Sequence, residues 1–271
     1  MDQLEGRVAV VTGAADGIGL ALCRRFAAAG ARVVMADIDE EKLAISTAGL
    51  EADGAVVLAV PTDVSDPERV KELERRTVER FGAAHVLCNN AGVGGAVAPV
   101  WKLDPEAFDW MLGINLKGVL HGVQAFVPGM IERGEPGHVV NTASIGGLLG
   151  FPHIGAYCTS KFAVVGLSES LLLDLRARKL PIGVSVLCPG ATATRLTENT
   201  QRLRGEEEAS MEDPPGSVRA DPLEIAGQVL EAILAERFFV VTHPGYAAPL
   251  RERHGVIEAG DGEPSPAGFY L

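Results

Sequence analysis

A hydroxyl, a phenol and an amine stand close together in the stretch SIGGLLGFPHIGAYCTSK, which runs from Ser144 to Lys161. If a helix begins near Gly155, Tyr157 and Lys161 lie on one face of it, one turn apart. A phenol has a pKa of about 10, but a neighbouring ammonium group stabilises the phenolate and lowers that pKa. These groups could therefore carry out acid–base chemistry. The alternative is a core tyrosine and a surface lysine at accidental spacing.

The element before Ser144 determines where its hydroxyl lies. The apolar run from His138 to Ala143 predicts a strand that ends just before the serine. Open α/β sheets bind ligands at the carboxyl ends of their strands, so the Ser144 hydroxyl is expected at such a site.

A glycine-rich turn near the N-terminus is a second, independent feature. Residues 7–12 predict a buried strand, 13–19 read GAADGIG, and 18–29 have helical periodicity. Glycines let backbone N–H groups approach a pyrophosphate, and the following helix N-terminus favours negative charge. Asp37 ends a second predicted strand about 20 residues further on, where a carboxylate can accept both ribose hydroxyls and repel a 2′-phosphate. Helix capping is the alternative in this segment, and Asp39 is better placed for it.

Together these features resemble the short-chain dehydrogenase/reductase family, over residues from about 5 to 245. The family marks TGxxxGxG, NNAG and Ser with YxxxK stand here, in the family's order, at Thr12–Gly19, Asn89–Gly92, Ser144, Tyr157 and Lys161. The resemblance implies that the last three residues are catalytic. It adds Asn115 as a fourth, whose backbone carbonyl holds a water beside the lysine. From propensity alone, Asn115 could equally be a solvent-facing residue in a helix.

The resemblance also implies NAD as cofactor, without a metal, because the phenol and the serine hydroxyl polarise the carbonyl together. Relatives that use NADP often carry a basic residue where this chain has Asp16. Asp63 is expected on the adenine amino group, with turn chemistry as the alternative. The expected cofactor contacts are Gly13, Asp16, Gly17, Ile18, Gly19, Asp37, Ile38, Asp63, Val64, Asn90, Ala91, Gly92, Tyr157, Lys161, Pro189, Gly190, Thr192 and Thr194.

Strand and helix patterns alternate along the chain. They predict a single doubly wound, Rossmann-type α/β domain: a mostly parallel seven-stranded sheet with helices on both faces. Residues 1–245 are expected to form the NAD-binding catalytic domain, with 106–133 mostly helical and a last helix over 221–236. The polar segment 195–222 stands where the family has its substrate lid, and no structure is assigned to the tail, 246–271.

Composition limits the partners. A net charge of −12 argues against nucleic acid and anionic membrane. No signal peptide and no apolar run of ~20 residues is found, so a cytoplasmic protein is expected. Four cysteines in apolar contexts support neither a disulfide framework nor a zinc site: Cys23, Cys88, Cys158 and Cys188. By analogy with the family, a homo-oligomer, tetramer or dimer, is expected through helices near 105–132 and 155–178.

The predicted substrate pocket has small or apolar walls: Val93, Gly94, Gly95, Gly146, Leu148, Leu149, His153 and Ala191. Arg195 is the only cation expected nearby, and a charged substrate would need one. We therefore expect an uncharged, hydrophobic secondary alcohol or ketone, such as an aryl-alkyl carbinol, an alicyclic alcohol or a steroid. Residues 89–161 and Thr242-His243-Pro244 also look similar to relatives that act on benzylic carbinols of lignin-derived aromatics. His153 is favoured as a pocket wall over a base.

Three other functions stay open. Polyol or sugar oxidation is the first, because family members with the same four catalytic residues carry it out. A catalytically silent NAD(H)-binding sensor is the second, although such relatives usually lose the Tyr or the Lys. Epimerases and dehydratases on nucleotide sugars share YxxxK, but they are longer and begin with GxxGxxG.

Overall fold

Seven parallel strands form one sheet in the computed structural model, which describes residues 3–95, 97–205 and 219–263. The spatial order is β3-β2-β1-β4-β5-β6-β7, so the order reverses between β1 and β4. The doubly wound fold is confirmed, and every strand pair is parallel. The strands are β1 (Val8–Thr12), β2 (Arg32–Asp37), β3 (Val57–Pro61), β4 (Val86–Asn89), β5 (Gly137–Thr142), β6 (Ile182–Cys188) and β7 (Phe239–Val241).

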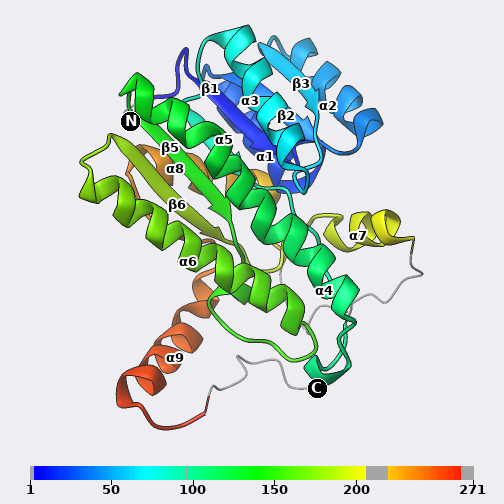
Figure 1. Ribbon diagram of the computed structural model, residues 1–271, viewed down its shortest axis with the longest axis vertical. Coiled ribbons are helices and arrows are strands. Elements are labelled where there is room, and N and C mark those ends of the chain that lie inside the picture. The colour runs from blue at the N-terminus through cyan, green and yellow to red at the C-terminus, as the bar shows by residue number, and fades with distance from the viewer. Residues whose placement is uncertain (1–2, 96, 206–218, 264–271) are drawn as a thin grey trace.

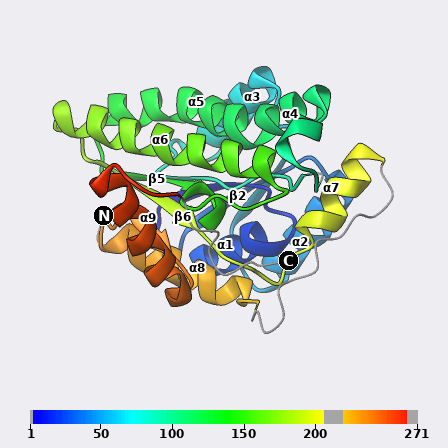
Figure 2. The ribbon, with the colours of Figure 1, turned by 90° about the horizontal axis from the view of Figure 1, so that it is seen from below.

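Helices cover both faces of the sheet, as Figure 2 shows with the sheet between two layers. One layer holds α1 (Gly17–Ala28), α2 (Glu40–Ala52) and α8 (Pro222–Leu234). The other holds α3 (Pro67–Phe81), α4 (Pro105–Leu112), α5 (Gly118–Arg133) and α6 (Gly155–Ala177). Because the central strands are covered on both sides, they read as continuous apolar runs; all five residues of β1 are buried.

Three helices share one start signal. Asp66, Asp104 and Asp221 each cap a helix through backbone N–H groups of its first turn, and each is followed by proline. Proline fits the first turn because its missing N–H would have no partner there. The strands predicted over 7–12 and 138–143 and the helices predicted over 18–29 and 221–236 agree with β1, β5, α1 and α8 within two residues at each end.

The prediction that 106–133 is mostly helical is confirmed, but the interior of this stretch is not α-helix. A π-helical turn, Gly113–Lys117, separates α4 from α5. Asn115 lies in this turn and is fully buried, so the solvent-facing alternative is wrong. Such turns are rare and frequently occur at functional sites.

The C-terminal region contains more structure than the sequence indicated. Within the expected lid, α7 spans Leu196–Arg204, and residues 206–218 lie outside the described residues. The 221–236 helix is not the last one, because α9 (Ala247–Ala259) follows it in the expected tail. Leu250 of α9 packs with Ile145 and Leu149, and the Arg253 guanidinium lies 5.2 Å from the Phe162 ring centroid of α6. Figure 1 labels both helices, α9 and α6.

Cys23, Cys88, Cys158 and Cys188 are free thiols, and all four are buried. Among the described residues, no helix combines the length and the apolar character that a membrane crossing requires.

Candidate active site

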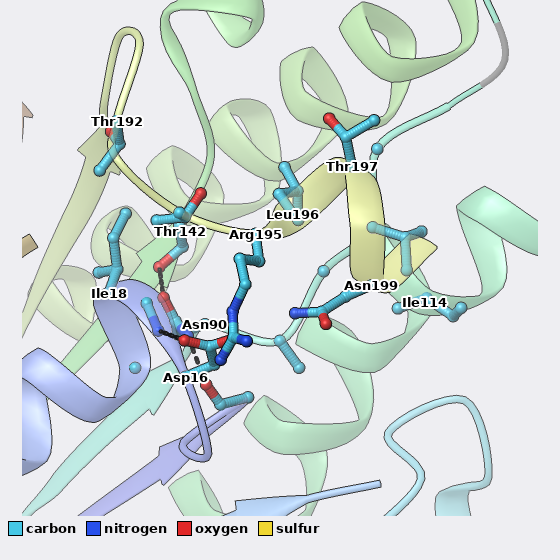
Figure 3. Close-up of a pocket in the computed structure, with 18 of the residues that line it drawn as sticks. Asp16, Ile18, Asn90, Ile114, Thr142, Thr192, Arg195, Leu196, Thr197 and Asn199 are labelled. Atoms are coloured by element: carbon cyan, nitrogen blue, oxygen red, sulfur yellow. Dashed lines mark hydrogen bonds and ion pairs between the residues drawn. The ribbon is translucent and has the colours of Figure 1, made fainter. Parts of the chain in front are cut away.

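A cavity of about 420 Å³ opens at the carboxyl ends of the strands, beside the reversal between β1 and β4. This is where open α/β sheets bind ligands. Every residue expected to contact the cofactor lines it, from the glycine loop to the segment after β6, and Ser144 lines it too. Figure 3 shows part of this lining, with Asp16 and Ile18 from the glycine loop facing residues of the lid.

The glycine loop has no room for side chains. Gly13 and Gly17 adopt left-handed backbone angles, with φ of 63° and 51°. A Cβ on Gly13 would lie 2.8 Å from the Cα of Ala91, and one on Gly19 would overlap the Gly13 carbonyl oxygen. Asp16 caps α1 by accepting from the Gly17 N–H at 2.8 Å. The loop therefore brings bare backbone and a helix N-terminus to the cavity.

Asp37 ends β2, and two backbone groups fix its carboxylate. It accepts from the N–H groups of Ala15 at 2.9 Å and Asp39 at 3.0 Å. Asp39 caps α2 through Lys42 N, which confirms that Asp39 is the capping residue. Asp63 makes the turn that was its alternative role, accepting from the N–H and the hydroxyl of Ser65. Asp63 also lines the cavity, so the turn leaves the adenine role open.

Lys161 connects α6 to the end of β5. Its Nζ donates to the Thr142 carbonyl at 3.0 Å and lies 5.6 Å from the Tyr157 ring centroid. Only 4% of Lys161 is exposed, and burial lowers the pKa of its ammonium group to about 8. The lysine is therefore charged at neutral pH but close to losing its proton.

The expected lowering of the Tyr157 pKa is not found. Burial raises the pKa of the phenol, and a hydrogen bond with Ser144 opposes this without outweighing it. Ser144 Oγ in turn accepts from Gly146 N at 3.1 Å and lies 3.4 Å from the Pro189 carbonyl oxygen. At neutral pH the tyrosine is a phenol, held beside the serine hydroxyl.

Asn115 is not among the described residues that line the cavity, but it contacts Val93, which does line it. Its Oδ1 accepts from Val93 N at 2.8 Å, and its Nδ2 donates to the Val93 carbonyl at 3.0 Å and to Ser160 Oγ at 3.1 Å. One side chain thus fastens the segment after β4 to α6, next to Lys161. The water-holding role of its backbone carbonyl stays a prediction.

The predicted substrate walls fall into two groups. Val93, Gly94, Gly95 and Ala191 line the cavity. The structure does not bring the other four to it, because the chain after Ser144 turns back as a 3-10 helix, Ile145–Gly147. Gly146 lies under the Tyr157 ring, Leu148 and Leu149 pack into apolar clusters, and His153 takes a left-handed conformation in which its carbonyl accepts from Ala98 N.

Helix α7, within the expected lid segment, lines the cavity and makes contacts on both sides of it. Arg195 Nε donates to Asp16 Oδ2 at 2.9 Å, and Arg202 pairs with Asp39 at 2.6 Å. Lys42 Nζ donates to Asn199 Oδ1 at 2.9 Å. On the substrate side, the buried Thr200 hydroxyl accepts from Gly94 N at 2.8 Å. Figure 3 shows Arg195 and Asn199 reaching from the lid toward Asp16.

Sequence reasoning missed most of these lid contacts. Lys42, Arg202 and Arg219 line the cavity in addition to Arg195, so Arg195 is not the only cation there. Arg195, Asn199 and Arg202 recur at helical spacing, and this is the signal that could have predicted a polar helix face. Their acidic partners follow β1 and β2, far away in the chain, and no local pattern pairs them with the lid.

The comparisons with known proteins agree with this geometry. A sequence model described as short chain dehydrogenase matches residues 7–204. The chain belongs to the short-chain dehydrogenase/reductase family. It is 39% identical over 252 residues to 1-deoxy-11-beta-hydroxypentalenate dehydrogenase of Streptomyces exfoliatus, which covers 93% of this chain and 88% of that protein.

Two further relatives bear on substrate and cofactor. The chain is 36% identical over 193 residues to 3beta-hydroxysteroid dehydrogenase 2 of Eggerthella lenta, covering 71% of this chain and 74% of that protein. The crystal structure of a family member from Burkholderia phymatum in complex with NAD superposes with a TM-score of 0.90, at 37% identity and 98% coverage of both chains. This short-chain dehydrogenase/reductase is thus similar to dehydrogenases of hydroxyl compounds.

The buried charge of Lys161 generates a prediction about stability. The pKa shift from 10.5 to about 8 corresponds to about 3 kcal/mol of cost at neutral pH, at about 1.4 kcal/mol per pKa unit. Lys161→Met removes this cost and the hydrogen bond to Thr142, so the free energy of unfolding at pH 7 should rise by about 1–2 kcal/mol. Urea denaturation measures it.

The pH dependence gives the sign of this effect. The cost is fully present below pH 8, fades as the folded protein releases the proton above pH 8, and is gone above the unfolded pKa of 10.5. The gain of Lys161→Met should therefore be smaller at pH 9.5 than at pH 7. Lys71→Met, on the exposed side of α3, is the control and should show no such trend. A Lys161→Met variant that is less stable than wild type at both pH values would contradict this account.

Proposed function

We propose that this protein is an NAD-dependent oxidoreductase that interconverts a hydrophobic, uncharged secondary alcohol and the corresponding ketone. One observation carries the proposal: Ser144, Tyr157 and Lys161 line the same cavity as the glycine loop and Asp37. The cavity thus combines a group that can exchange a proton with a hydroxyl and residues suited to a dinucleotide.

The cavity fits the cofactor. The bare backbone of the glycine loop and the N-terminus of α1 suit a pyrophosphate, and the fixed carboxylate of Asp37 suits the two ribose hydroxyls. Pro189, Gly190 and Thr192 are proposed to hold the nicotinamide carboxamide. Bound there, nicotinamide supplies or accepts a hydride at its C4 atom.

The chain's own residues handle the proton. In ketone reduction, the Tyr157 phenol donates its proton to the substrate oxygen, and in alcohol oxidation the phenolate takes that proton back. Burial raises the Tyr157 pKa, so the donor form is present at neutral pH and oxidation should require higher pH. Ser144 is proposed to hydrogen-bond the same substrate oxygen. Its hydrogen bond with Tyr157 also opposes the rise in the tyrosine pKa. Lys161 is proposed to bind the nicotinamide ribose.

A hydroxy acid is the second candidate substrate. The name of the Streptomyces exfoliatus relative specifies a hydroxypentalenate, which is a carboxylate. Arg195 lines the cavity, but its guanidinium is paired with Asp16, and Lys42 and Arg202 are held by Asp39. Because these cations already have acidic partners, the uncharged substrate is favoured.

The first test is the proton-transfer group. Tyr157→Phe removes the titrating oxygen and little volume, so turnover should fall by at least ~100-fold, the low end for general acid–base catalysis. NADH affinity, measured by fluorescence titration, should be nearly unchanged and serves as the control for folding. Retained turnover would assign the proton transfer to another group.

The second test is cofactor choice. Catalytic efficiency should be higher with NAD than with NADP, because Asp37 repels a 2′-phosphate and the nearby Lys42 and Arg202 are both paired with Asp39. Asp37→Ala should narrow the gap without necessarily reversing it, whereas Asp53→Ala, at the exposed end of α2, should not alter it. Equal efficiency of the wild-type enzyme with both cofactors would refute the NAD preference.

The third test is substrate class. With NAD, a benzylic or alicyclic secondary alcohol should give a higher catalytic efficiency than sorbitol or a hydroxy acid, because Val93, Gly94, Gly95 and Ala191 offer apolar or small walls. NADH absorbance measures all of them in one panel. If the hydroxy acid is the best substrate, Arg195 must exchange Asp16 for the substrate; if the polyol is best, polar groups of the lid must bind it. NADH binding without turnover of any compound would instead favour a sensor.

A further inference from the structure

His243 joins the end of β7 to the segment that follows β6. Its ring lies between two backbone groups of the loop 189–194: Nδ1 is 3.1 Å from Gly190 N, and Nε2 is 2.9 Å from the Ala191 carbonyl oxygen. A third contact joins Nδ1 to the neighbouring Thr242 hydroxyl at 2.7 Å. His243 lies outside the glycine loop, the NNAG turn and the Ser144, Tyr157 and Lys161 motif, and the chemistry proposed above does not use it.

These contacts determine which ring nitrogen carries the proton. An amide N–H only donates, so Nδ1 must accept from Gly190; a carbonyl only accepts, so Nε2 must donate to Ala191. Neutral histidine with its proton on Nε2 satisfies both bonds, and the Thr242 hydroxyl then shares the single Nδ1 lone pair with the Gly190 N–H. An imidazolium would turn an N–H toward the Gly190 N–H and lose that bond.

The ring also fills the space behind the loop. A Cβ on Gly190 would lie 3.0 Å from His243 Cγ and 2.8 Å from the Tyr246 ring. The two rings meet edge to face, with centroids 6.3 Å apart. Gly190 thus packs closely against the rings of His243 and Tyr246, and the hydrogen bond from its N–H orients the peptide group.

The loop held by His243 borders both halves of the site. Pro189, Gly190 and Thr192 line the cavity, and the Pro189 carbonyl accepts from Ile145 N at 2.8 Å and lies 3.4 Å from Ser144 Oγ. A shift of Gly190 would therefore move the proposed carboxamide site and the contact to the serine together. A mispositioned reacting group of this kind lowers the rate without unfolding the protein.

We propose that His243 is a positioning residue that holds the loop 189–194 in the conformation required for cofactor binding; this rests on the NAD-dependent function proposed above. The test compares wild type with His243→Phe, which keeps the ring volume and loses both hydrogen bonds. His243→Asn restores an acceptor near the Nδ1 position, and His243→Gln restores a donor near the Nε2 position. His254→Phe, on the exposed side of α9, is the matched control.

In steady-state kinetics, His243→Phe should raise the KM for NAD about tenfold, the size expected from two hydrogen bonds worth a few-fold each, with a smaller fall in kcat. His243→Asn and His243→Gln should each recover part of this loss. Thermal unfolding serves to separate positioning from stability, since a purely structural role would lower Tm and leave the KM of the folded enzyme unchanged.

A second measurement does not depend on activity. Long-range ¹H–¹⁵N spectra of the full-length protein at pH 8 report which ring nitrogen carries the proton. The signals of the His243 ring are identified as those missing from the spectrum of His243→Phe. In the wild-type protein these signals should show the proton on Nε2. A proton on Nδ1, or a His243→Phe variant with the wild-type KM for NAD, would overturn the proposal while the wild-type enzyme still binds NADH. If the wild-type protein binds no NADH, the proposed function itself fails, and this role of His243 fails with it.

Discussion

The hydrogen bond from Lys161 to the Thr142 carbonyl sets the geometry on which the site depends. It joins the last residue of β5 to the second turn of α6, at 3.0 Å. Ser144 follows that strand and Tyr157 precedes the lysine by one turn, so this contact fixes how far apart the hydroxyl and the phenol stand. The arrangement requires a buried charge, whose cost appears as the depressed pKa of the lysine. The buried lysine therefore lowers the free energy of unfolding, while its hydrogen bond positions the serine and the tyrosine in the protein without ligand.

Helix α7 is held beside the cavity by a different kind of interaction. The lid helix α7 presents Arg195 and Arg202 to the aspartates that cap α1 and α2. Partial burial would raise the pKa of Asp16, but hydrogen bonds from Gly17 and Arg195 outweigh this and lower it. These contacts are partly exposed to solvent and each contributes little. Contacts of this strength hold α7 in place and can be broken at little cost.

Local patterns predicted much of the fold and the site. The glycine loop, Asp37 and the Tyr157–Lys161 pair are short-range features, because each depends on residues within one turn of structure or at the end of one strand. Leu148 and His153 lie outside the cavity for a long-range reason: the chain after Ser144 folds back and packs under α9, a helix without a clear apolar stripe. The burial of Asn115 depends on Val93 and Ser160, which approach it only in the folded protein.

The transfer of hydrogen from substrate to cofactor tests the central claim most directly. A benzylic secondary alcohol with deuterium on its carbinol carbon should be incubated with the wild-type enzyme and NAD, and the NADH analysed by mass spectrometry and NMR. If the substrate carbon is held against the nicotinamide, the NADH should carry one deuterium at C4, and no deuterium should be released to water. NADH without deuterium, or deuterium found in the solvent, would contradict direct hydride transfer in this cavity.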